Sequence, residues 1–178
     1  MSLPGSSHAF FASVRTAISI SKTRWLLRTL LAIVHIHHLI TINKNNSMII
    51  DKKLMDELSS NAKRSTRLRI NYDLRNSERD QSQRMLNVLE PGTKMTIHRH
   101  TETNETICML RGSIREVICD EFGNEIKSII LKAGSDCPAM MIPIGVWHKL
   151  ECLEEGTILL TVKDGAYRPM NEEDTIVL

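Results

Sequence analysis

The chain has 178 residues, of which 42% are hydrophobic and only 4% aromatic, with 23 Lys and Arg against 21 Asp and Glu. This composition indicates one globular domain with an appendage and excludes a disordered or fibrous protein. Residues 1–50 carry five basic side chains and no acidic one, whereas residues 51–178 carry 18 basic and 21 acidic side chains. The folded part is therefore expected to be mildly acidic, which argues against a nucleic-acid partner.

Residues 1–47 are expected to be a basic, acid-free extension that is poorly ordered or is an artefact of an upstream start codon, since Met48 precedes the change in composition. The most apolar stretch, 25–42, is interrupted by Arg28 and three histidines. A bilayer-spanning helix needs about 20 predominantly apolar residues, so no membrane partner is predicted. An organelle transit peptide stays open as an alternative, because such peptides are also basic and poor in acids.

Four cysteines, Cys108, Cys119, Cys137 and Cys152, contain no C-x-x-C pair of the kind that binds zinc or exchanges disulfides. A domain of this size can be stable without disulfides, and free cysteines are commonly buried. Reduced thiols and a cytoplasmic location are therefore predicted.

Residues 48–178 are predicted to form the folded domain, which begins with an amphipathic helix over about 51–64, capped by Asp51. Beyond it, glycines recur every 11 residues from Gly112 to Gly156, between segments rich in Ile, Val, Leu, Thr and Met. This turn spacing predicts an all-β sandwich or barrel, with its core at about 84–165. The expected strands lie near 84–89, 94–100, 105–111, 113–120, 125–132, 138–142, 147–153 and 157–163.

Three histidines lie outside the extension, and their spacing suggests a metal site. His98 and His100 are two residues apart in a predicted strand, so both side chains leave the same face. A four-residue turn then brings Glu105 into the next strand, opposite the histidine pair. Two imidazoles and a carboxylate suit a divalent ion, and His148, from a distant hairpin, is the candidate for a further ligand.

The pattern Gly92-x5-His98-x-His100-x4-Glu105-x6-Gly112 resembles the first cupin motif, and Pro143-Ile144-Gly145-Val146-Trp147-His148 resembles the core of the second. This resemblance implies a cupin double-stranded β-helix, or jelly-roll barrel, holding one metal ion on His98, His100, Glu105 and His148. Two departures concern the second motif. Gly134 stands nine positions before Pro143, and Cys152 replaces the Asn that often ends the motif.

Several further segments resemble those of the WbuC-type cupin-fold metalloproteins, a likeness that extends over about residues 51–170; they are 67–69, 83–87, 89–93 and 162–167. The resemblance implies a metal-dependent, isomerase- or epimerase-like activity on a carbohydrate or sugar nucleotide in surface-polysaccharide metabolism. The cofactor would be one divalent ion, and His and Glu ligands suit Zn, Fe, Mn or Ni. Two alternatives stay open: an iron-dependent dioxygenase, and a non-catalytic sugar-binding or regulatory module.

Beyond the metal ligands, the candidate catalytic residues are Lys94, Arg84 and Tyr167, and the candidate substrate-binding residues are Thr96, Trp147 and Cys152. Lys94 and Thr96 share strand parity with His98, and Cys152 shares it with His148. Glu116 and Glu151 are further polar candidates, although parity directs Glu151 outward.

Met95 and Ile97 would form an apolar face on the outside of the barrel. Such a face is expected to be covered by the helix over 51–64 or by a second subunit. A homodimer is therefore predicted. The resemblance implies that it binds a small, carbohydrate-derived molecule.

Overall fold

The computed structural model describes residues 47–177, so the expectations for residues 1–46 lie outside the described residues. The described chain contains one α-helix, α2, one short 3-10 helix, η1, and ten strands. Their bounds are α2 Lys52–Arg64, β1 Arg69–Asp73, β2 Ser82–Leu89, β3 Ile97–His98, β4 Glu105–Arg111, β5 Ser113–Cys119, β6 Glu125–Lys132, β7 Ala139–Ile142, β8 Trp147–Cys152, β9 Thr157–Asp164, η1 Glu172–Asp174 and β10 Thr175–Ile176.

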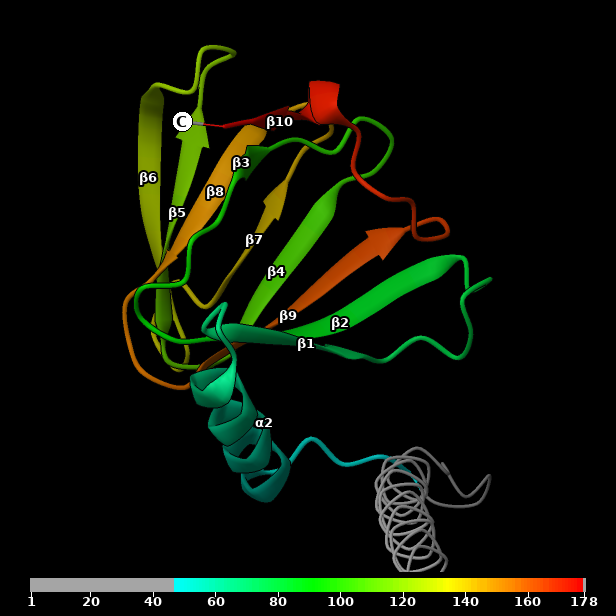
Figure 1. The fold of residues 1–178 in the computed structure, drawn as a ribbon, viewed down its shortest axis with the longest axis vertical. Helices are drawn as coiled ribbons and strands as arrows, with labels where there is room; N and C mark the ends of the chain where they lie inside the picture. The colour runs from blue at the N-terminus through cyan, green and yellow to red at the C-terminus, as the bar shows by residue number, and fades with distance from the viewer. Residues whose placement is uncertain (1–46, 178) are drawn as a thin grey trace, which may run out of the picture. The chain divides into compact units, whose positions relative to one another are not determined.

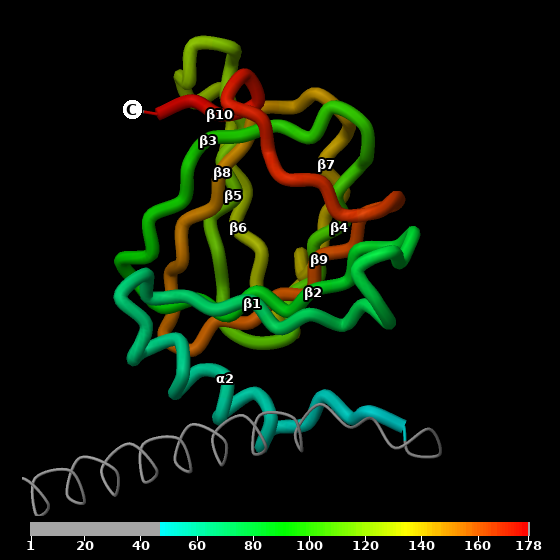
Figure 2. The backbone as a smooth tube through the Cα atoms, turned by 45° about the vertical axis from the view of Figure 1, so that its right-hand side comes forward, coloured from blue at the N-terminus to red at the C-terminus, as the bar shows by residue number. Residues whose placement is uncertain are grey.

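The strands form two antiparallel five-stranded sheets, with the orders β1-β2-β9-β4-β7 and β10-β3-β8-β5-β6. Figures 1 and 2 show that the two sheets face each other and enclose a common interior. The main core fills this interior with buried side chains from both sheets: Leu89, Ile107, Met109, Ile114, Leu131, Ile142 and Leu159. The predicted all-β jelly roll with a short N-terminal helix is confirmed.

Helix α2 begins where the sequence predicts it. The side chain of Asp51 accepts a hydrogen bond of 2.9 Å from the backbone N–H of Leu54, which satisfies one of the free donors at the helix start. Leu58 and Ala62 are buried against Leu86 and other side chains of β2 and β9. These β2 residues alternate with the ones that face the barrel interior, so α2 covers the outer face of that sheet.

The five glycines of the 11-residue pattern all have positive φ, as tight turns require. Gly112, between β4 and β5, shows the requirement most clearly. A Cβ atom added there would lie 3.0 Å from the Cα atom of Thr157. This glycine therefore permits both the left-handed turn and the close approach of β9.

The predicted strand at 94–100 is much shorter in the structure, because β3 contains only Ile97 and His98. Residues 93–96 instead cross from one sheet to the other, and Arg69 of β1 donates a hydrogen bond of 3.1 Å to the Lys94 carbonyl. Strand parity therefore does not apply to residues 94–96. Strands β1 and β10 were not predicted.

Of the two residues expected to form an apolar outer face, Met95 instead lines a cavity within the barrel, and Ile97 is covered within the chain. Ile97 is only 2% exposed, and it clusters with Val117, Cys119, Trp147 and Ile176 on the outer face of its sheet. Helix α2 packs elsewhere, on β1 and β2. The burial of Ile97 therefore requires neither the helix nor a second subunit.

Candidate metal centre

The cluster of His98, His100, Glu105 and His148 joins residues of both sheets. His98 of β3 stands directly opposite His148 of β8 in the strand register. Glu105 is the first residue of β4 in the other sheet. His100 follows β3, and its carbonyl accepts a hydrogen bond of 2.7 Å from Gly145, which fixes this loop against the second motif.

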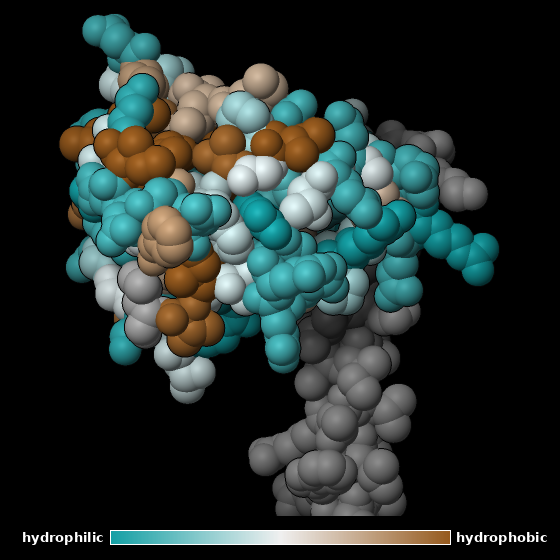
Figure 3. Space-filling view, turned by 90° about the horizontal axis from the view of Figure 1, so that it is seen from above, coloured by the Kyte–Doolittle hydropathy of each residue, from teal (hydrophilic) through white to brown (hydrophobic). Residues whose placement is uncertain are grey.

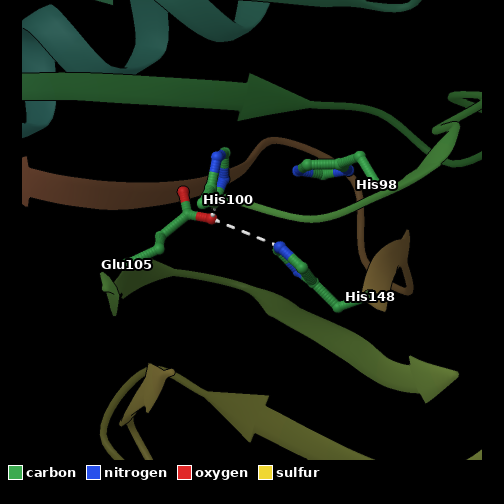
Figure 4. Close-up of side chains that lie close together, drawn as sticks. All are labelled: His98, His100, Glu105 and His148. Carbon is green, nitrogen blue, oxygen red and sulfur yellow. Dashed lines mark hydrogen bonds and ion pairs between the residues drawn. The ribbon is translucent and has the colours of Figure 1, made fainter. Parts of the chain in front are cut away.

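Figure 4 shows the three imidazoles and the carboxylate directed toward one another. One potential ligand atom from each of the four residues lies within 4.8 Å of all the others. The Nε2 atom of His100 is 3.0 Å, and that of His148 3.7 Å, from Oε2 of Glu105. The structure therefore brings together all four residues that the sequence predicts as metal ligands.

Hydrogen bonds orient two of the imidazoles for metal binding. Nδ1 of His98 lies 3.0 Å from the Thr96 carbonyl, and Nδ1 of His148 lies 2.8 Å from Oε1 of Glu116. When Nδ1 donates in these contacts, Nε2 carries the lone pair that a metal requires. Nε2 of His148 is buried without a hydrogen-bond partner among the described residues. Buried polar atoms without partners are rare, and a cation in the cluster would satisfy this one.

Burial and neighbouring groups set the protonation of three residues in the cluster. Burial lowers the pKa of His98 and of His148 to about 4, so both imidazoles are neutral at neutral pH. Burial also opposes the ionisation of Glu105, but the hydrogen bond from His100 and the charge of Lys163 together bring the pKa of Glu105 down to about 2. Neutral imidazoles beside an ionised carboxylate are the forms in which these side chains bind metals.

Glu116 lies behind the cluster. Its side chain is fully buried, and burial together with the nearby charge of Glu105 raises the pKa of Glu116 to about 9. The sequence suggests Glu116 as a substrate contact or an acid–base group. The structure instead places it against the Nδ1 side of His148, where it orients the imidazole and is shielded from any ligand.

An inner cavity of about 180 Å³ lies beside the cluster within the barrel. Its polar wall comprises Asn71, Gln83, Asn87, Thr161 and Lys163, and apolar side chains complete it. An outer pocket of about 540 Å³ shares Gln83, His100, Lys163, Tyr167 and Met170 with the inner cavity. The cluster is thus connected through these shared residues to a larger pocket at the surface.

Of the six candidate catalytic and substrate-binding residues outside the cluster, Tyr167 alone lines the inner cavity. Arg84 alternates with the inward-facing residues of β2 and pairs with Asp80 at 2.6 Å. Lys94 and Thr96 line a separate surface pocket, because the segment before β3 is not a strand.

Trp147 and Cys152 also lie outside the inner cavity. Trp147 is on the outer face of its sheet, with the Arg99 guanidinium 4.6 Å from its ring centre. Cys152 faces inward, as parity predicts, but it packs against the main core and is two residues beyond Leu150, which lines the cavity. Glu151 points outward, as expected, and pairs with Arg115 at 3.1 Å.

Lys163 and the amide side chains of the cavity wall were missed by sequence reasoning. Lys163 of β9 stands opposite Glu105 in the pairing with β4 and opposite Gln83 in the pairing with β2. One signal was available in the sequence, because Thr161 and Lys163 are polar at positions that share parity with Leu159 of the predicted strand. Those polar positions indicate a cavity wall only once the pairing of β9 with β2 and β4 shows which face of β9 points into the barrel.

Residues 50–131 match a family model described as a domain of unknown function (DUF6016). Among curated proteins, none matches the sequence significantly. Within residues 47–177, no helix has the length and apolar content needed to cross a membrane.

Similar solved structures include an oxalate decarboxylase, with 26% identity over 54% of this chain and 25% of that chain and a TM-score of 0.44. KdgF from Halomonas sp. has 12% identity over 71% of this chain and 94% of its own, with a TM-score of 0.46. The capsular polysaccharide assembling protein CapF from Staphylococcus aureus has 20% identity over 61% of this chain and 31% of its own, with a TM-score of 0.48. The chain thus spans about a quarter of the oxalate decarboxylase and a third of CapF.

Proposed function

We propose that this chain is a metal-binding cupin of the WbuC type that holds one divalent ion on His98, His100, Glu105 and His148. The observation that carries the proposal is the convergence of these four groups inside the barrel, with the buried Nε2 atom of His148 left without a partner. The donor set suits Zn, Fe, Mn or Ni.

The proposed reaction is isomerase- or epimerase-like and acts on a carbohydrate-derived substrate. A bound divalent ion would polarise a substrate carbonyl or hydroxyl oxygen. The chain's own residues would bind the substrate, because amide and hydroxyl groups line the inner cavity beside the cluster. Asn87 and Thr161 are joined by a hydrogen bond of 3.0 Å, which positions both for contact with substrate hydroxyls. Tyr167 lies at the junction with the outer pocket, where it would restrict water entry.

The proposal includes a cellular setting. Residues 48–178 would be the working unit, a cytoplasmic homodimer in surface-polysaccharide metabolism. Exposed apolar side chains support a second subunit: Phe122 is 74%, Ile126 67% and Ile130 60% exposed. Figure 3 shows apolar groups at the surface, interspersed with hydrophilic ones, on the face seen from above.

Elemental analysis of the natively purified full chain tests the proposal. We expect one divalent ion per chain, and we expect His98→Ala and His148→Ala each to lose most of it. His8→Ala is the matched control, since it removes a histidine far from the cluster in sequence. Thermal shift with sugar phosphates and nucleotide sugars, with and without metal, then tests the substrate class. Absence of stoichiometric metal, or unchanged metal content in both cluster variants, would refute the proposal.

A further inference from the structure

Lys163 is a largely buried cation at the junction of the inner cavity and the outer pocket. Its side chain is only 19% exposed and lines both spaces. The Nζ atom lies 3.4 Å from Nε2 of His100 and 3.7 Å from Oε1 of Glu105. An ammonium group directed at this cluster is unexpected if the cluster is to bind a cation, because like charges repel. Lys163 and Glu105 balance each other in the metal-free cluster, so a bound cation would favour a further negative charge beside them.

The charged residues around the inner cavity determine how much negative charge would be needed to balance a bound divalent ion. Among the described residues that line it, Glu105 and Lys163 are the only Asp, Glu, Lys or Arg, and their charges cancel. A divalent ion would therefore leave an excess of two positive charges, or of one if Glu116 behind the cluster also ionised. The walls around this charge include Ile107, Leu150 and Leu159. An unpaired charge in such surroundings is costly, so an anion is favoured.

We infer that the inner cavity takes a small hydroxylated carboxylate, such as a sugar acid or a shorter hydroxy acid, whose carboxylate pairs with Lys163. The inference rests on the proposed function, because the excess positive charge arises when the cluster holds a divalent ion. Asn71, Gln83, Asn87 and Thr161 on the polar wall supply donors and acceptors for the ligand's hydroxyl groups.

The size of the inner cavity and the pairing of nearby arginines favour a carboxylate over a larger phosphate ester. At about 180 Å³ the inner cavity suits a small ligand, and a nucleoside diphosphate would have to extend into the outer pocket. The two arginines of the outer pocket are already paired, Arg99 with Asp174 at 2.8 Å and Arg168 with Glu102 at 2.6 Å. Arg99 is therefore engaged in a partly buried pair, while the exposed pair of Arg168 would compete only weakly with a phosphate.

Titration calorimetry on the metal-loaded full chain tests the inference, with metal content measured on the same samples. The probes are glucuronate, the shorter acid glycerate, neutral glucose and glucose 6-phosphate. We expect one or both acids to bind 10- to 100-fold more tightly than glucose, as a charge-assisted hydrogen bond would provide. Lys163→Gln should lose this preference while keeping its metal. Lys127→Gln, on the exposed strand β6, is the matched control and should behave like the wild type.

Four results would overturn the inference. They are equal affinity for the acids and glucose, no binding of either acid, an acid preference that survives in Lys163→Gln, and tighter binding of glucose 6-phosphate than of both acids. Each result can occur with the metal in place, so the proposed function would stand without the inference. Absence of metal from the wild-type protein would instead refute the proposed function, and the inference with it.

Discussion

The buried contact between Glu116 and His148 predicts that metal affinity depends on Glu116, a residue that does not itself bind the metal. Oε1 of Glu116 lies 2.8 Å from Nδ1 of His148, and both side chains are almost fully buried. Glu116→Met keeps a side chain of similar size but removes the acceptor, so the imidazole loses its orientation and Nδ1 loses its partner. Loss of such a partner typically weakens metal binding 10- to 100-fold, or by about 1.4–2.8 kcal/mol.

Competition with a chromophoric chelator would measure this loss for each variant. Glu116→Gln should bind metal more tightly than Glu116→Met, because its amide oxygen still accepts from Nδ1. Urea unfolding of the metal-free proteins is the second readout. The unpaired Nδ1 atom costs about 1–3 kcal/mol in Glu116→Met, offset in part because Met also removes Oε2 of Glu116, which is buried without a partner among the described residues. Glu151→Met is the matched control, since Glu151 is on the outer face of the same sheet and pairs with Arg115. Wild-type metal affinity in Glu116→Met would refute the argument.

Three further predictions concern the metal-free domain and are measurable by urea unfolding. Between pH 4.5 and 6.5 the free energy of unfolding should rise with pH by roughly 2 kcal/mol, because folding lowers the pKa of His98 and His148 from 6.5 to about 4 and raises that of Glu116 from 4.5 to about 9. In this window the two histidines make the folded chain bind up to two protons fewer and Glu116 makes it bind up to one more, so a flat or falling profile would contradict these shifts. Gly112→Ala should lower the free energy of unfolding more than Gly134→Ala does. Both glycines have a φ of +72°, which costs an alanine about 1–2 kcal/mol at either position, but only at Gly112 would the new Cβ atom overlap Thr157. Equal losses in stability would show that the overlap is relieved. Asp51→Ala should lower the free energy of unfolding by about 1 kcal/mol, because it removes the cap of α2. Asp51→Asn should retain most of the stabilisation from the cap, and an equal loss in both variants would contradict capping.

The candidate ligands could be predicted because their spacing within each motif is local. His98, His100 and Glu105 lie within eight consecutive residues joined by one short turn, so the chain itself limits their separation. His148 required the second motif, since its pairing with His98 joins residues 50 positions apart. The strands over 105–111 and 125–132 were predicted with their full bounds because alternating segments and glycine turns define them.

The substrate-facing residues were harder to predict, because their placement depends on pairing between distant strands. The strand predicted over 94–100 would direct Lys94 and Thr96 inward, but β3 begins only at Ile97. The crossing between the sheets, where Arg69 contacts Lys94, leaves no local pattern in the sequence. Strand β10 escaped prediction for the same reason, since two residues become a strand there only by pairing with β3.

The position of Lys163 in the strand register predicts a different ligand from the one that the net charge of the domain predicts. The charge count of residues 51–178 shows a mildly acidic domain, which by itself favours cationic partners. Pairing of β9 with β4 places Lys163 beside Glu105 in a largely apolar cavity, and few acidic residues face that space. Most of the negative charge is on the surface, where water and salt screen it, while the charge of Lys163 acts at short range in a low dielectric. A ligand of this domain should therefore be selected by the charge of the cavity and not by the net charge of the chain.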